Sequence, residues 1–197
     1  MLYIISRNKY KILSQKHRKL IILCTPTYKL AKRLNDLIRP YIPSDYSLKS
    51  TDDFIDLLRS TRPEGLIASL DVESLFTNVP VETTIEIILK NVYEHPTLPR
   101  LDIPKNILAQ LLRSCTTQAP FKSPDGNLYL QIEGVAMGSP LGPTFANFYM
   151  GNLEQSVLRD QNIKPNIYCR YVDDIFVVVR NEDHLSNYKR EWSHPQC

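Results

Sequence analysis

The sequence of 197 residues has few cysteines, few glycines and no long hydrophobic run. Its four cysteines stand far apart, without a CxxC pair or a cluster with histidine, which argues against a disulfide framework or a zinc site. No apolar run approaches the roughly 18 residues that a membrane-spanning helix needs, and residues 1–24 are too basic for a secretory signal. We therefore expect reduced thiols in an intracellular protein that has no membrane partner and no disulfide partner.

Acidic residues are almost absent from the first 40 positions, where ten lysines and arginines accompany a single acid, Asp36. The formal net charge of +3 therefore conceals about +9 in this arm and about −6 in the remainder. A basic arm of this kind suits a polyanion such as nucleic acid, and it equally suits a solvated terminus.

Hydrophobic periodicity predicts helices and separated strands in a mixed order, with no repeats or low-complexity tracts. The expected helices cover 26–40, 50–60, 80–95, 104–115 and 140–160. The expected strands cover 65–72, 167–172 and 175–179, and a hairpin over 121–134 turns at a Pro-Asp-Gly sequence. This order predicts an α+β fold with an antiparallel sheet rather than regular βαβ winding.

The stretch RYVDDIFVVV, residues 170–179, places the adjacent carboxylates Asp173 and Asp174 inside a run that otherwise has the composition of a buried strand. If the strands on either side pair as a hairpin, both aspartates lie at its tight turn. An Asx turn, in which a side chain bonds its own backbone, explains one aspartate. Two like charges among apolar residues favour a bound divalent cation, which relieves their repulsion.

A further aspartate, Asp71, ends the apolar strand in SLDVESLF about a hundred residues earlier. Two strands of one sheet that both end in aspartate would bring three carboxylates to one edge. Hard oxygen ligands of this kind suit Mg²⁺, and two such ions about 3.5–4 Å apart are typical of polymerases and nucleases.

Between these acidic strands lies GVAMGSPLGPTFANF, residues 134–148. Its small residues allow the backbone to approach a ligand closely, and Ser139 with Pro140 is well placed to open the following helix. Glycine-rich turns are common, so the position of this segment between the two acidic strands carries more weight than its composition.

These three segments, in this order, resemble the palm of a reverse transcriptase, over roughly residues 25–179. Asp71 to Phe76, an aspartate followed five positions later by an aromatic residue, resembles the first catalytic motif. QIEGVAMGSPLGP resembles the second motif and YVDD the third. The segment SLDVESLFTNVP, together with PTYKLAKRL upstream, resembles the sequences of Penelope-like retroelements more closely than those of retroviral or LINE enzymes.

The resemblance implies a metal site that catalyses nucleotidyl transfer. Asp71 and Asp173 would be the principal ligands of two Mg²⁺ ions, with Mn²⁺ as a substitute. Asp174 would be the accompanying carboxylate, and the main-chain carbonyl of Val72 a further ligand. One ion would activate the primer 3′-hydroxyl and the other would hold the leaving pyrophosphate.

The resemblance also implies contacts with an RNA template, a DNA primer and incoming deoxynucleotides. Phe76 would be a steric gate that excludes the ribose 2′-hydroxyl, although an ordinary core phenylalanine remains an alternative. Gly138, Ser139 and Pro140 would line the template and the incoming nucleotide, and Tyr171 would lie near the primer terminus. Recognition of the hybrid would rest on its backbone and shape.

Departures from the family pattern define the expected domains. Residues 1–24 form a basic, unassigned segment in which only Arg18 and Lys19 are conceivable triphosphate ligands. Residues 25–180 are the palm with partial fingers, and 181–197 are the start of a region leading to a thumb. We therefore expect a fragment with incomplete fingers and thumb, weak in processive synthesis and nuclear when expressed.

Three alternatives remain open at this point. An RNA-directed RNA polymerase shares the palm and the paired aspartates, although Phe76 argues against it. A telomerase-like enzyme would carry an RNA-binding domain that has no counterpart in the sequence. A catalytically inactive remnant would bind nucleic acid through the basic arm alone.

Overall fold

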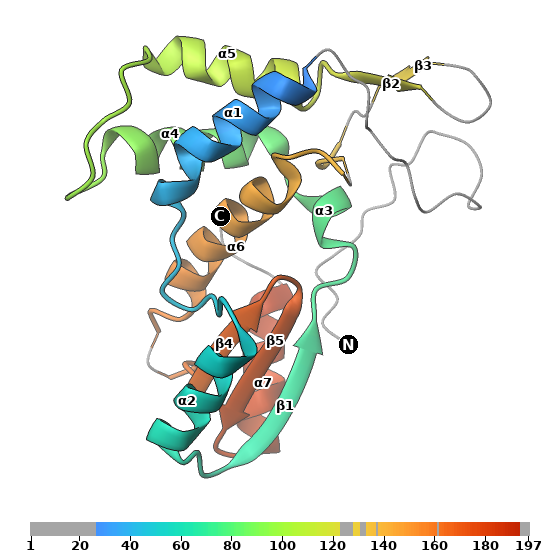
Figure 1. The fold of residues 1–197 in the computed structure, drawn as a ribbon. Helices are drawn as coiled ribbons and strands as arrows, with labels where there is room; N and C mark the ends of the chain where they lie inside the picture. The colour runs from blue at the N-terminus through green and yellow to red at the C-terminus, as the bar shows by residue number, and fades with distance from the viewer. Residues whose placement is uncertain (1–26, 123–127, 131–132, 137, 161, 194–197) are drawn as a thin grey trace. The chain divides into compact units, whose positions relative to one another are not determined.

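The computed structural model describes residues 27–122, 128–130, 133–136, 138–160 and 162–193 (Figure 1). Its helices are α1 (Tyr28–Ile38), η1 (Arg39–Tyr41), α2 (Thr51–Thr61), α3 (Leu75–Asn78), α4 (Val81–Tyr93), α5 (Lys105–Cys115), α6 (Gly142–Val157) and α7 (Glu182–Ser193). Its strands are β1 (Leu66–Asp71), β2 (Pro120–Lys122), β3 (Leu128–Leu130), β4 (Ile167–Tyr171) and β5 (Asp174–Val179).

These elements divide into two compact units. Among the described residues, the sheet unit comprises 44–73 and 150–193, and the helical unit comprises 27–43 and 74–149. None of the helices that the structure describes is long and apolar enough to cross a bilayer.

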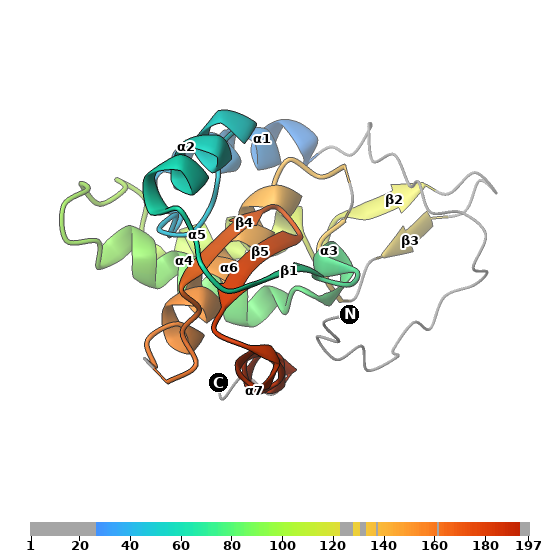
Figure 2. The same cartoon turned by 90° about the horizontal axis from the view of Figure 1, so that it is seen from below.

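The sheet unit is built on three antiparallel strands in the order β1-β5-β4, with β5 in the middle (Figure 2). The β1–β5 register runs from Leu66 opposite Val179 to Asp71 opposite Asp174. The β4–β5 register ends with Tyr171 opposite the same Asp174. Both pairings therefore bring the ends of all three strands to one edge of the sheet.

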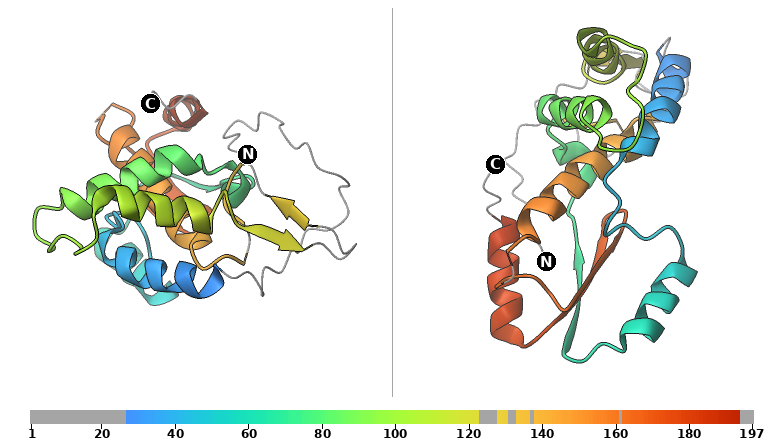
Figure 3. Two further views of the ribbon diagram at one scale, coloured as in Figure 1. Left: turned by 90° about the horizontal axis from the view of Figure 1, so that it is seen from above. Right: turned by 90° about the vertical axis from the view of Figure 1, so that its left-hand side faces the viewer.

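The two faces of this sheet are covered by different helices. Figure 3, in its right-hand view, shows α2 and α7 on opposite sides of the strands. On one face, Phe176 of β5 packs edge-on against Phe54 of α2, with ring centroids 5.0 Å apart. On the other face, Tyr168 of β4 stacks on Trp192 of α7 with ring centroids 6.0 Å apart. Alternation of side chains along the strands accounts for this division.

Helix α2 has clear local start and stop signals. Ser50 and Asp53 form a capping box, in which the Asp53 amide donates to Ser50 Oγ at 3.2 Å and the Ser50 amide donates to Asp53 Oδ2 at 3.0 Å. The helix ends at Arg62, whose φ of 42° is left-handed. Its apolar stripe is only half buried, because the helix lies on the outside of the sheet.

The helical unit packs α1, α4 and α5 around an aliphatic core. Buried side chains recur at helical spacing on each helix: Ala31, Leu34 and Ile38 on α1, Ile85, Ile88 and Val92 on α4, and Leu108 and Leu112 on α5. A two-pronged contact between Arg113 and Glu82, at 2.7–3.1 Å, links α5 to α4 at the surface.

Most predicted elements are confirmed, and the antiparallel α+β arrangement is as expected. The predicted hairpin over 121–134 pairs as β2 and β3, while its Pro-Asp-Gly turn lies outside the described residues. Helix α7 was not predicted, because its buried side chains include polar and aromatic groups instead of an aliphatic stripe. His184, Tyr188 and Trp192 are its buried residues in the part that the structure describes.

Gly134 occupies a position that requires glycine. Its φ is 71°, and a Cβ built on it would lie 2.5 Å from the Thr77 carbonyl oxygen. The next residue, Val135, donates its amide to the Phe76 carbonyl at 2.8 Å. The chain therefore passes directly against α3 at this point, and a side chain would separate the two segments.

We predict that Gly134→Ala lowers the free energy of unfolding by at least about 2 kcal/mol, because a left-handed residue with a Cβ costs about 1–2 kcal/mol before the clash is counted. Gly142→Ala is the matched control. The nearest atom to a Cβ there is the Ala136 carbonyl oxygen at 3.3 Å, and we expect a change below about 1 kcal/mol. Urea denaturation measures both, and equal losses in the two variants would contradict this account of Gly134.

Candidate active site

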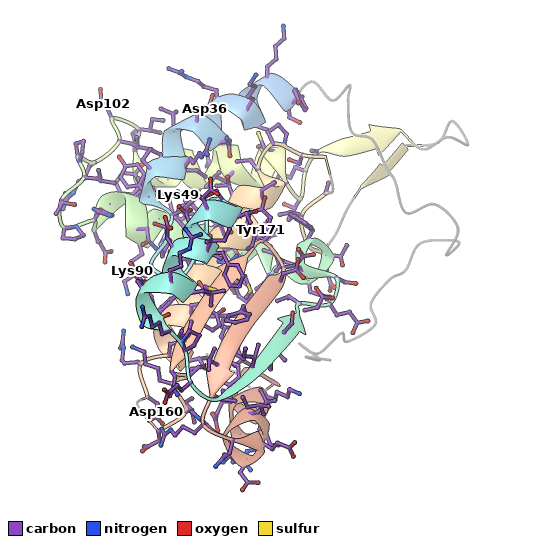
Figure 4. The ribbon with its side chains drawn as sticks, turned by 60° about the horizontal axis from the view of Figure 1, so that its bottom comes forward. Asp36, Lys49, Lys90, Asp102, Asp160 and Tyr171 are labelled. Carbon is purple, nitrogen blue, oxygen red and sulfur yellow. The ribbon has the colours of Figure 1, made fainter. Side chains whose placement is uncertain are left out.

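The acidic edge of the sheet, formed by Asp71, Asp173 and Asp174, gathers the three predicted aspartates on two neighbouring strand ends. Asp71 and Asp174 are direct cross-strand partners, so their side chains leave the same face of the sheet. Both are exposed, whereas Asp173 is half buried. Tyr171, the partner of Asp174 on the other side, is 54% exposed and lies at the end of the β4–β5 hairpin (Figure 4).

The predicted hairpin is confirmed, but it turns through Val172 and Asp173. Asp174, which the sequence placed in the turn with Asp173, is instead the first residue of β5 and pairs with both neighbouring strands. Val172 has a φ of 56°, a left-handed conformation that β-branched residues rarely adopt and that glycine usually occupies in such turns. The Asp173 carbonyl accepts the Val72 amide at 3.0 Å. This hydrogen bond joins the turn directly to the residue that follows Asp71.

The donor set at the acidic edge suits a hard divalent cation. No ion pair or side-chain hydrogen bond joins the three carboxylates to other residues within the described part of the chain. In that part no three His, Cys, Asp or Glu side chains stand close enough together to hold a metal ion as they are placed. The edge thus supplies ligands of the right chemistry on neighbouring strands rather than a closed cage.

A buried polar cluster of Arg170, Glu154 and Tyr168 lies beneath this edge, and the sequence reasoning did not find it. Arg170 is wholly buried on β4, and its guanidinium pairs with Glu154 of α6 through Nε to Oε1 and Nη2 to Oε2, the latter at 3.3 Å. The Tyr168 hydroxyl donates to Glu154 Oε1 at 2.8 Å. The available signal was a charged residue inside an apolar strand, the same signal that identified the aspartates.

Burial and the Glu154 carboxylate raise the pKa of two tyrosine hydroxyls, those of Tyr168 and Tyr188. Burial, with the Glu154 carboxylate nearby, raises the pKa of Tyr168 well above its ordinary value. Burial and the same carboxylate also raise the pKa of Tyr188. The raised pKa of Tyr168 favours the protonated hydroxyl, which is the form that donates to Glu154.

The helical unit holds a second group of predicted residues, Phe76 and the Gly138-Ser139-Pro140 segment. The Phe76 ring lies 3.7 Å from the position that a Cβ on Gly142 would occupy, at the start of α6. Ser139 shapes that start, because its Oγ accepts the Leu141 amide at 3.3 Å and its carbonyl accepts the Gly142 amide at 3.0 Å. Phe76 itself is half buried.

The nine predicted site residues therefore fall into two groups, each assembled within one unit. Asp71, Val72, Tyr171, Asp173 and Asp174 belong to the sheet unit, and Phe76, Gly138, Ser139 and Pro140 belong to the helical unit. Each group combines segments that are distant in sequence, about a hundred residues in the first case and about sixty in the second.

Comparisons with solved structures show the same fold in telomerases. Telomerase from Candida albicans, in complex with the TWJ fragment of telomeric RNA, has a TM-score of 0.61 and 15% sequence identity, covering 83% of this chain and 31% of that chain. Apo telomerase from Candida tropicalis, truncated from the C-terminal domain, has a TM-score of 0.58 and 19% identity, covering 87% and 37%. This chain thus spans about a third of those chains, and at such identities the likeness concerns the fold alone.

Comparisons of sequence point to one family. No curated protein sequence matches the chain significantly. The model of the family described as reverse transcriptase (RNA-dependent DNA polymerase) matches residues 7–194, which is nearly the whole chain. On this match, the chain belongs to the reverse transcriptase family.

Proposed function

We propose that this chain is the polymerase core of a Penelope-like retroelement and that it adds deoxynucleotides to a DNA primer on an RNA template. Family membership supports RNA-directed DNA polymerase chemistry. The observation that carries the proposal further is the cross-strand pairing of Asp71 with Asp174, with Asp173 in the adjoining turn.

The acidic edge is the proposed metal site. Asp71 and Asp173 are the principal ligands, Asp174 accompanies them, and the Val72 carbonyl is a main-chain ligand. When bound, two Mg²⁺ ions, or Mn²⁺ in their place, lower the pKa of the primer 3′-hydroxyl and stabilise charge on the leaving pyrophosphate. The strands contribute by fixing the carboxylates, since positioning supplies much of the rate in phosphoryl transfer.

The second group selects and places the nucleotide. The half-buried Phe76 ring occupies the space of a ribose 2′-hydroxyl, so that deoxynucleotides are preferred. The backbone of Gly138, Ser139 and Pro140 lies against the template and the incoming nucleotide, where small residues permit close approach. Tyr171, exposed at the hairpin end, lies near the primer terminus.

The assignment to a Penelope-like element rests on the sequences of two segments, SLDVESLFTNVP and PTYKLAKRL. The structural likeness to telomerases supports the shared fold without favouring a telomeric substrate, given identities of 15–19%. Phe76 argues against an RNA polymerase palm, since a ring that excludes the ribose 2′-hydroxyl would hinder an enzyme that incorporates ribonucleotides.

We predict that Asp71→Asn and Asp173→Asn each reduce the addition of the first nucleotide by at least about 100-fold, because even outer-shell partners of metal ligands contribute 10–100-fold. A primer annealed to an RNA template, with Mg²⁺ or Mn²⁺, provides the assay. The same variants should weaken Mn²⁺ binding measured by electron paramagnetic resonance.

Asp56→Asn serves as the control for this prediction, because Asp56 is an exposed carboxylate on α2 that pairs with Arg59 at 4.0 Å. It should leave both readouts unchanged. If the aspartate variants bind Mn²⁺ as the wild type does, the acidic edge is not the metal site. If the wild type itself neither binds Mn²⁺ nor extends a primer, the chain is an inactive remnant.

We predict that Phe76→Ala raises the incorporation of ribonucleotides relative to deoxynucleotides by roughly 10- to 200-fold, the range that a steric pocket contributes to discrimination. The measurement is the ratio of kcat/KM for matched nucleotide pairs. Phe54→Ala is the control, because it removes a phenylalanine ring of α2 that packs on the sheet against Phe176. It should leave this ratio unchanged even if it lowers the stability of the protein. An unchanged ratio in Phe76→Ala would mean that the ring is ordinary core packing.

A further inference from the structure

Arg170 makes a contact that an ordinary core ion pair would not need. Besides its two contacts with Glu154, its Nη1 donates to the main-chain carbonyl of Val172 at 2.8 Å. Val172 is the turn residue with a φ of 56°. A buried guanidinium therefore holds the peptide between Val172 and Asp173 from below, while Glu154 fixes the guanidinium from α6.

We propose that Glu154 and Arg170 are positioning residues for nucleotidyl transfer, which hold the Val172–Asp173 turn so that Asp173 keeps its place beside Asp71. The inference rests on the proposed function and adds two residues to it. The proposed role needs no contact of either residue with the primer, the nucleotide or the metal. They act through the backbone of the turn.

The physical reason is the conformation of Val172. A β-branched residue in the left-handed region is strained, and such a residue persists only where its surroundings fix it. A charge-assisted hydrogen bond from the buried guanidinium to the Val172 carbonyl is stronger than a neutral one. Without it, the turn is free to relax toward a conformation that carries Asp173 with it.

The held turn is connected to the other acidic strand. The Asp173 carbonyl accepts the Val72 amide at 3.0 Å, so the turn and the end of β1 move together. The chain of contacts thus runs from Glu154 to Arg170, on to the Val172 carbonyl, and through Asp173 to Val72. Tyr168 also belongs to this chain of contacts, because its hydroxyl donates to Glu154 Oε1 at 2.8 Å.

The decisive variant replaces both partners by apolar residues, Glu154→Leu with Arg170→Met. Replacing a whole buried pair by hydrophobic residues of similar volume is often neutral for stability, whereas removing one partner leaves an unpaired buried charge. We expect a modest fall in melting temperature, because the buried Tyr168 hydroxyl loses its acceptor, together with a roughly 10- to 100-fold fall in kcat for the first nucleotide and an unchanged KM. A purely structural pair would leave kcat at the wild-type value.

Hydrogen exchange supplies a readout that does not depend on activity. In the double variant, exchange of the Val72 amide should accelerate by at least about 10-fold, because its acceptor on Asp173 is no longer held. The Val177 amide in the middle of β5 should keep its protection and so reports that the sheet is folded. Wild-type protection of Val72 in the double variant overturns the proposal.

A matched control pair is available in the helical unit. Glu82→Leu with Arg113→Met removes a two-pronged Arg–Glu contact of the same kind at the surface and should change neither kcat nor Val72 exchange. If the buried double variant fails to fold, Arg170→Lys takes its place. The lysine ammonium group retains the positive charge beside Glu154 but lacks the second nitrogen that donates to the Val172 carbonyl. The same two readouts, kcat and exchange of the Val72 amide, therefore apply.

Failure of the two proposals can be told apart. A wild-type chain that adds no nucleotide counts against the proposed function, and Val72 exchange then decides the positioning inference alone. An active wild type combined with a fully active, folded double variant counts against the positioning inference and leaves the proposed function standing.

Discussion

The buried pair of Arg170 and Glu154 is the constraint on which the acidic edge depends. Both side chains are almost completely excluded from solvent, at 0% and 1% exposure, so neither charge can exist there without the other. Removing one partner of such a pair typically costs about 3–5 kcal/mol, which is a large share of the stability of a domain. The pair therefore ties β4 to α6 with a fixed geometry, and the turn that carries Asp173 is built on that fixed strand.

Strain is concentrated where the two acidic strands end. Val172 has a φ of 56° in the turn after β4, and Ser74 has a φ of 54° three residues after Asp71. Conformations of this kind persist only where neighbouring hydrogen bonds determine them. The amide of Val72 and the guanidinium of Arg170 provide those bonds at the hairpin. The aspartates are thus held by a backbone that has little freedom to adjust, which is the preorganisation that electrostatic catalysis requires.

The sequence predicted the local features of this arrangement and the meeting of the three aspartates, but not the strand register or the buried contacts that produce it. Strand periodicity and the placement of charge inside RYVDDIFVVV predicted the hairpin, because a hairpin depends on residues that are near in sequence, although the turn lies one residue earlier than predicted. The pairing of Asp71 with Asp174 required a register between strands a hundred residues apart, which periodicity does not fix. Glu154 was missed because a single acid in an amphipathic helix is normally solvated, and only its partner on β4 explains its burial. Helix α7 was missed because aromatic residues replace the usual aliphatic stripe.

Two aspartates placed directly opposite each other destabilise an antiparallel pair, so the sheet must be held in register by something else. The apolar residues next to the two aspartates hold the strands in register. Leu70 and Ile175, one step inward from Asp71 and Asp174, are 3% and 1% exposed. A slip of one residue would exchange the two sets, placing carboxylates on the buried face and aliphatic side chains in water. Because the cost of that exchange far exceeds the repulsion between two exposed carboxylates, the apolar residues of β1 and β5 are what specify the position of the acidic edge.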